Sequence, residues 1–115
     1  MRYMLMIYED EDAWRAASAA ERDALYAGHR DLMEALTATG KDVRGAELEP
    51  RTTAVSLRGG SDAGRLQVDG PFTESREVLG GYYVVECQDL DEAVTWADRI
   101  PTLGGGIEVR PIVTA

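Results

Sequence analysis

Residues 79–101 read LGGYYVVECQDLDEAVTWADRIP and hold the pattern that decides the fold class. In the segment 79–88, apolar side chains occupy both alternating sets of positions, which is typical of a strand buried on both faces. A helix is predicted from Asp89, with Glu92 at the capping-box position and Pro101 as its stop. A buried strand followed at once by an amphipathic helix indicates a mixed α and β protein.

The beginning of the chain has the same order of elements. Residues 2–8 (RYMLMIY) are apolar at both alternating sets of positions and predict a second strand buried on both faces. A short helical turn is expected over 10–17. A longer helix is expected from Ser18, which forms a capping box with Glu21, to a stop at Gly40.

Weaker strands complete the pattern. Two are expected at 41–48 and 52–58, separated by Pro50, and a short extended piece is expected at 65–68. The last strand is expected at 107–113. The resulting order, β-α-β-β-α-β, predicts an α+β sandwich of the ferredoxin-like type.

Two helices can cover only one face of the predicted sheet. The two strong strands nevertheless have apolar residues on both faces, so the second face needs a cover that this chain does not supply. A second copy of the chain, packed sheet against sheet in a homodimer, is the expected cover. An obligate partner protein would meet the same need.

Length and charge exclude several functional classes. The 115 residues are the size of a single domain, 1–115, and carry a formal net charge of -9. Such an acidic chain is a poor binder of nucleic acid or of an anionic membrane surface. No apolar run approaches the length of a membrane span or a signal peptide, so we expect a cytoplasmic protein.

Metal and cofactor chemistry find little support in the composition. One cysteine, Cys87, excludes an intramolecular disulfide and a cysteine-based zinc cage. With one histidine beside it, no metal site and no cofactor are predicted, although a carboxylate-only site for a hard cation stays open. Cys87 itself is expected to be a small buried apolar residue.

Four segments together resemble a known family. They are DGPF at 69–72, the stretch 79–101, GGIEVRPI at 105–112 and RYMLMIY at 2–8. The chain resembles the DGPF-type branch of the YCII-related (YciI-like) family over essentially its whole length. The resemblance implies a dimeric α+β barrel of ferredoxin-like subunits. It also implies an enzymatic His–Asp pair in the YciI-like branch and an association of the DGPF branch with extracytoplasmic-function sigma factors.

His29, the single histidine, is the first candidate catalytic residue. It lies on the apolar stripe of the predicted helix, where a cleft over the sheet would lie, and its ordinary pKa near neutrality suits general acid–base catalysis. The YciI-like branch has a histidine eleven residues before the glycine that closes this helix, as His29 stands before Gly40. The alternative is a structural histidine hydrogen-bonded to a backbone carbonyl.

Asp69 is the candidate catalytic partner of His29. A carboxylate on an imidazole nitrogen fixes the tautomer and stabilises the imidazolium. The alternative is that Asp69 opens a turn with Gly70 and Pro71 and caps backbone amides. In the YciI-like branch the acid follows the first helix, which leaves Asp42 as the other choice.

Three aromatic residues, Phe72, Tyr82 and Tyr83, are candidates for substrate binding. Neighbouring strand residues point to opposite faces, so one tyrosine must face the helices and the other the expected dimer partner. Their rings could line a small-molecule pocket. The alternative is that they are ordinary core residues.

Two functional hypotheses follow from the sequence. In the first, a small dimeric enzyme uses His29 and Asp69 for general acid–base chemistry on a small polar metabolite. In the second, a non-catalytic module senses a ligand or binds a protein partner within a sigma-factor system. The acidic surface, including the run 9–12, would then serve binding.

Overall fold

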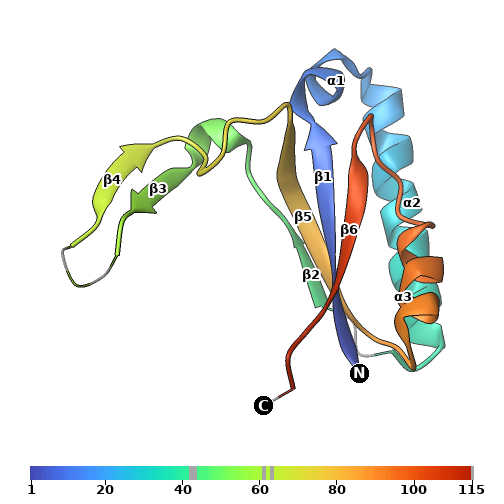
Figure 1. The fold of residues 1–115 in the computed structure, drawn as a ribbon. Helices are drawn as coiled ribbons and strands as arrows, with labels where there is room; N and C mark the ends of the chain where they lie inside the picture. Colours follow the sequence, from blue (N-terminus) through green and yellow to red (C-terminus); the bar gives the residue numbers. More distant parts are fainter. Residues whose placement is uncertain (42–43, 61, 63, 115) are drawn as a thin grey trace.

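A four-stranded antiparallel sheet with its helices on one face forms the body of the protein (Figure 1). The computed structural model describes residues 1–41, 44–60, 62 and 64–114. The sheet strands, in spatial order, are β2 (Arg44–Glu47), β5 (Glu77–Glu86), β1 (Arg2–Asp10) and β6 (Gly106–Pro111). This order and the antiparallel pairing fit a ferredoxin-like fold, as the sequence predicts.

The described residues form three α-helices beside the sheet: α1 (Glu11–Ala16), α2 (Ala19–Ala38) and α3 (Leu90–Ala97). The capping box predicted at Ser18 is present, with both reciprocal hydrogen bonds to Glu21. The side chain of Asp89 likewise accepts a hydrogen bond from the backbone N–H of Glu92. The predicted helix starts are therefore confirmed. None of the helices in the described part of the chain is long and apolar enough to cross a membrane.

The core lies between the sheet and the two longer helices. It takes alternate residues of β1 and β5, apolar residues of α2 and small alanines of α3, which let that helix approach the sheet closely. Its members are Tyr3, Leu5, Ile7, Leu32, Leu36, Tyr83, Val85, Cys87, Ala93, Ala97 and Ile100. Cys87 is buried among them, as expected of a small apolar residue.

The other face of the sheet has none of the described helices over it (Figure 1). Met4, Met6 and Tyr8 alternate with the buried residues of β1 and are half-buried. The register places Met6 beside Tyr82 on one side and Glu108 on the other. The sequence predicts strands buried on both faces. In the single chain they are fully buried only on the face that packs against the helices.

The middle of the chain differs from the expected pattern. After Pro50 comes a single 3-10 turn (Arg51–Thr53), and then β3 (Val55–Arg58) pairs with β4 (Leu66–Asp69) in a separate two-stranded sheet. Figure 1 shows this hairpin projecting from the main sheet. The radius of gyration is 16.0 Å, against roughly 13 Å for a compact chain of this length. The sequence predicts these strands, but not that they leave the sheet.

Candidate functional site

A cleft of about 680 Å³ opens between α2 and the β2–β5 side of the sheet. Its size lies within the usual range of small-molecule sites. The cleft exists partly because α3 packs toward β1 and β6, so that α2 alone among the described helices covers this side. Two residues on the helix-facing side of the strands, Gly45 and Gly81, also contribute no side chain to fill it.

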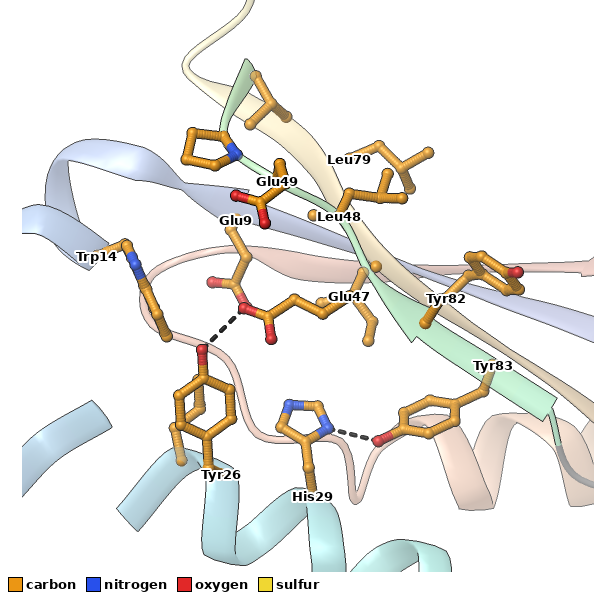
Figure 2. A pocket seen from close by; sticks show the side chains of 18 of the residues that line it. Glu9, Trp14, Tyr26, His29, Glu47, Leu48, Glu49, Leu79, Tyr82 and Tyr83 are labelled. Atoms are coloured by element: carbon orange, nitrogen blue, oxygen red, sulfur yellow. Dashed lines mark hydrogen bonds between the residues drawn. The ribbon is translucent and has the colours of Figure 1, made fainter. Parts of the chain in front are cut away.

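His29 and Tyr83 meet at the floor of this cleft (Figure 2). His29 comes from α2 and Tyr83 from β5, and His29 Nδ1 lies 2.6 Å from the Tyr83 hydroxyl oxygen. Their rings are stacked, with centroids 5.8 Å apart. A Cβ atom on Gly45 would stand 2.9 Å from the ring of Tyr83, so the glycine leaves room for the tyrosine in this position.

Burial shifts the pKa values of His29 and Tyr83 in the directions that favour their neutral forms. Loss of solvent is the main cause that lowers the pKa of His29, while hydrogen bonding to the Pro101 backbone and the charge of Glu47 oppose it. Burial also raises the pKa of Tyr83. A neutral imidazole hydrogen-bonded to a neutral phenol can pass a proton in either direction.

Carboxylates surround the mouth of the cleft. The cleft is lined by Glu9, Glu11, Glu47 and Glu49. Glu47 accepts a hydrogen bond of 2.8 Å from the Tyr26 hydroxyl, and Figure 2 shows Glu9 and Glu47 close to each other above it. Burial raises the pKa of Glu9, and the negative charge of Glu47 adds to that rise.

An aromatic wall closes one end of the cleft. The rings of Trp14 and Tyr26 meet edge to face, with centroids 5.7 Å apart. The guanidinium of Arg22 lies 5.3 Å from the Trp14 ring and donates to the Trp14 carbonyl. These contacts hold α1 against the start of α2 and fix the wall in place.

The predicted catalytic acid is in another part of the molecule. Asp69 is exposed at the end of β4, opposite Val55, and is not among the described residues that line the cleft. The hydrogen bond of His29 Nδ1 goes to Tyr83 instead. Asp42, the other choice, lies outside the described residues.

The three predicted binding residues are also separated. Figure 2 shows Tyr82 and Tyr83 on opposite sides of β5, with Tyr83 reaching the histidine. Phe72 belongs to the segment after β4, where the residue is 61% exposed and its ring lies 4.4 Å from the Arg58 guanidinium. Phe72 is not among the described residues that line the cleft, whereas both tyrosines are.

Sequence reasoning missed the acidic and aromatic lining. Tyr26 precedes His29 by one helical turn, so the i, i+3 spacing could have placed it beside the histidine. Glu9 and Glu47 come from two strands whose relative position depends on the whole sheet. The described residues also contain no group of three or more His, Cys, Asp or Glu side chains that could hold a metal ion.

Comparison with known proteins identifies the family. The YCII-related domain family matches the chain over residues 1–115. The chain belongs to the YCII-related family. An uncharacterized protein of Rhizobium meliloti (strain 1021) is similar to it, with 34% identity over 116 residues that cover 97% of this chain and 92% of the relative. The site of this YCII-related protein must therefore be interpreted from its own geometry.

Proposed function

We propose that this YCII-related protein is a small enzyme that transfers a proton to or from a small polar molecule in the cleft. The carrying observation is the 2.6 Å contact between His29 Nδ1 and the Tyr83 hydroxyl, at the floor of an open cleft. A structural histidine would be hydrogen-bonded to a backbone carbonyl, as the contact of His29 with the Pro101 backbone permits, but it would also be sealed in packing. His29 is half-buried and lines open space.

The hydrogen bond lets the pair act as an acid or as a base. When the Tyr83 hydroxyl donates to Nδ1, Nε2 carries the hydrogen; as that hydrogen passes to a ligand, Nδ1 takes the phenol proton, so the imidazole stays neutral and Tyr83 is left as a phenolate. When Nδ1 carries the hydrogen and donates to the Tyr83 oxygen, Nε2 has the free lone pair and can remove a proton. Hydrolysis, elimination and isomerisation are all open to such a pair.

In this proposal Tyr83 takes the place that the sequence predicts for Asp69. Within one chain the hairpin carries Asp69 outside the cleft, while Tyr83 already contacts the histidine. A catalytic role for Asp69 remains a prediction and needs the cleft of a second copy of the chain. Variants of Tyr83 and of Asp69 distinguish the two assignments.

The test detects proton transfer whatever the type of reaction. A panel of small polar metabolites is incubated with the protein in D₂O. Mass spectrometry records whether each compound takes up deuterium and whether it is consumed. At least one compound should change, and His29→Gln should slow that change by roughly 100-fold, as for loss of a general acid–base residue. An unchanged panel, or a fully active His29→Gln variant, would refute the proposal.

We further propose that the chain forms a homodimer and, with it, the α+β barrel of the DGPF-type branch. Two apolar surfaces support this: the open sheet face and the projecting hairpin. An isolated two-stranded hairpin is marginally stable in water. The large apolar residues exposed on and beside this one are Val55, Leu57, Leu66, Val68 and Phe72.

Charge favours a second copy as the occupant of these surfaces. Residues 51–76 hold four arginines and three acids, a net charge of +1, against −10 for the rest of the chain. The segment 51–76 of one copy is thus far less acidic than the body of another, so a contact between them is less opposed by charge than a contact between two acidic bodies. Sedimentation should show a dimer that Leu66→Glu weakens and Val94→Glu, at an exposed site on α3, leaves intact. A monomeric wild-type protein would contradict the proposal.

A non-catalytic ligand sensor within a sigma-factor system is the second candidate, and the same cleft favours it. Its predicted acidic partner surface at 9–12 is largely engaged within the chain, since Asp10 caps α1 and Glu11 pairs with Arg51 at 3.0 Å. A sensor would bind its ligand unchanged. The D₂O experiment therefore separates the two candidates.

A further inference from the structure

The charge of the cleft lining is one-sided. Four glutamates line the cleft that holds His29, and none of the described residues that line it is lysine or arginine. Burial lowers the pKa of His29 and so favours its neutral imidazole. The histidine therefore adds no positive charge to balance the glutamates. A ligand that enters this cleft therefore meets a negative potential focused by apolar walls.

One of these glutamates has a cationic partner. Glu11 pairs with Arg51 at 3.0 Å. Within the described residues no lysine or arginine forms an ion pair with Glu9, Glu47 or Glu49. Glu9 is held by the backbone N–H of Leu103, 3.1 Å away.

The aromatic wall adds a second, independent feature that suits a cation. Aromatic faces attract ammonium and guanidinium groups. Trp14 already shows this contact within the chain, with the Arg22 guanidinium 5.3 Å from its ring centre. Tyr26 extends the wall toward Glu47, to which its hydroxyl donates a hydrogen bond.

Building on the proposed function of the His29–Tyr83 pair, we propose that the ligand is a small organic cation with an amine or guanidinium head and an apolar body. Glu9 and Glu47 bind the cationic head beside Tyr26. The apolar body lies along Leu25 and Met33 toward the histidine.

The lining excludes simpler occupants on chemical grounds. An anionic metabolite would face the glutamates with no basic side chain among the described residues of the lining. A metal ion needs several ligands gathered at one point, and the described residues hold no group of three suitable side chains. An organic cation instead spreads its contacts over carboxylates and apolar walls. The apolar residues lining the cleft include Ile7, Leu25, Met33 and Val78.

Three probes of similar shape and different charge test the proposal: phenethylamine, phenethyl alcohol and phenylacetate. Their affinities for the full chain are measured by isothermal titration calorimetry and by saturation-transfer NMR. Phenethylamine should bind roughly tenfold more tightly than the alcohol, because hydrogen bonds to charged groups are the stronger ones. Phenylacetate should show no binding.

Matched variants show whether the cleft carboxylates are responsible. Glu47→Gln keeps an oxygen that can accept the Tyr26 hydrogen bond, and it should weaken phenethylamine roughly tenfold while leaving phenethyl alcohol unchanged. Glu9→Gln should act in the same direction. Glu108→Gln removes the same charge from an exposed site on β6 and should change neither affinity. Circular dichroism confirms that each variant is folded.

The outcomes separate this inference from the proposed function. Equal binding of the amine and the alcohol, absence of binding by all three probes, or equal effects of Glu47→Gln and Glu108→Gln would each overturn the organic-cation proposal. Deuterium exchange into an anionic compound that depends on His29 would overturn it too and leave the acid–base proposal standing. Selective amine binding with a silent D₂O panel would refute only the acid–base proposal.

Discussion

The cleft and the projecting hairpin differ in the side chains that they bury: the cleft buries polar groups among apolar ones, and the hairpin leaves large apolar groups exposed. The cleft holds a half-buried histidine, a half-buried glutamate and a buried tyrosine, and loss of solvent shifts the pKa values of all three. The hairpin exposes Leu57 and Leu66 and buries Ser56, which donates to the Gly70 carbonyl. The first region supports the proposed chemistry on a small molecule, while the second supports the proposed contact with another copy of the chain.

The largest expected effect contrasts a leucine beneath the cleft with a leucine of the hairpin. Leu5 is completely buried, and Leu5→Ala should lower the free energy of unfolding by about 2–5 kcal/mol. Leu66 is 67% exposed in the single chain, and Leu66→Ala should cost under ~0.5 kcal/mol for the monomer. Urea unfolding at several protein concentrations measures both. A large, concentration-dependent loss for Leu66→Ala would show that a second copy covers the hairpin.

Two glycines provide the next comparison. A Cβ atom at Gly45 would lie 2.6 Å from the Tyr82 carbonyl oxygen and 2.9 Å from the Tyr83 ring, whereas Gly60 in the hairpin has open space. Gly45→Ala should therefore cost about 1–3 kcal/mol, as overpacking does, and Gly60→Ala should be close to neutral. Thermal unfolding checks the cost. If Gly45→Ala left the stability unchanged, close packing at Gly45 would not be what fixes the position of Tyr83 in the cleft.

The titration of His29 gives an effect of intermediate size. Its pKa is lowered by burial, so the unfolded chain takes up the proton first as the pH falls. The stability from the neutral imidazole is complete above the unfolded pKa of about 6.5 and is lost as the pH falls through the lowered folded value. NMR should therefore find the imidazole midpoint below about 6.5.

A variant isolates the contribution of this histidine. The difference in unfolding free energy between the wild type and His29→Gln should change with pH only within that window, since all carboxylates remain in both proteins. A pH-independent difference would mean that His29 is not shielded from solvent. Tyr83→Phe should also alter the ¹⁵N shifts of the imidazole, because it removes the partner of Nδ1.

The smallest expected effect concerns the hairpin acid. Asp69→Asn should leave the imidazole midpoint and ¹⁵N shifts of His29 unchanged in the single chain, because Asp69 is exposed on β4 and does not line the cleft. The same NMR titration measures this. A clear shift that appears only at dimer-forming concentrations would place Asp69 beside the histidine of the other copy.

The sequence predicts the parts of this fold that depend on local signals. Ser18 and Asp89 start their helices through their own side chains, and the alternation in 2–8 requires no knowledge of the partner strand. The pairing of 55–58 with 66–69 could not be predicted in this way. Both strands are short, and nothing in their local pattern separates a hairpin from two strands of the sheet.

The site follows the same rule. His29 stands out because it is the single histidine on an apolar stripe. Its contact with Tyr83 joins residues 54 positions apart and depends on how α2 lies over the sheet. Asp69 stands out through its motif, and a motif carries no information about which copy or which face its side chain meets.

The hairpin lies wholly within the connection between β2 and β5 and forms a sheet of its own, separate from the four-stranded one. Insertions, deletions or new side chains there would alter the proposed dimer surface while the hydrogen bonds beneath the cleft stay as they are. The reverse holds for Glu9 and Glu47, which form no ion pair with a described residue of the hairpin, whereas Glu11 pairs with Arg51 at its base. The proposed dimer surface and the proposed ligand site can thus diverge largely separately during evolution, and the hairpin is a suitable place to graft a new recognition loop.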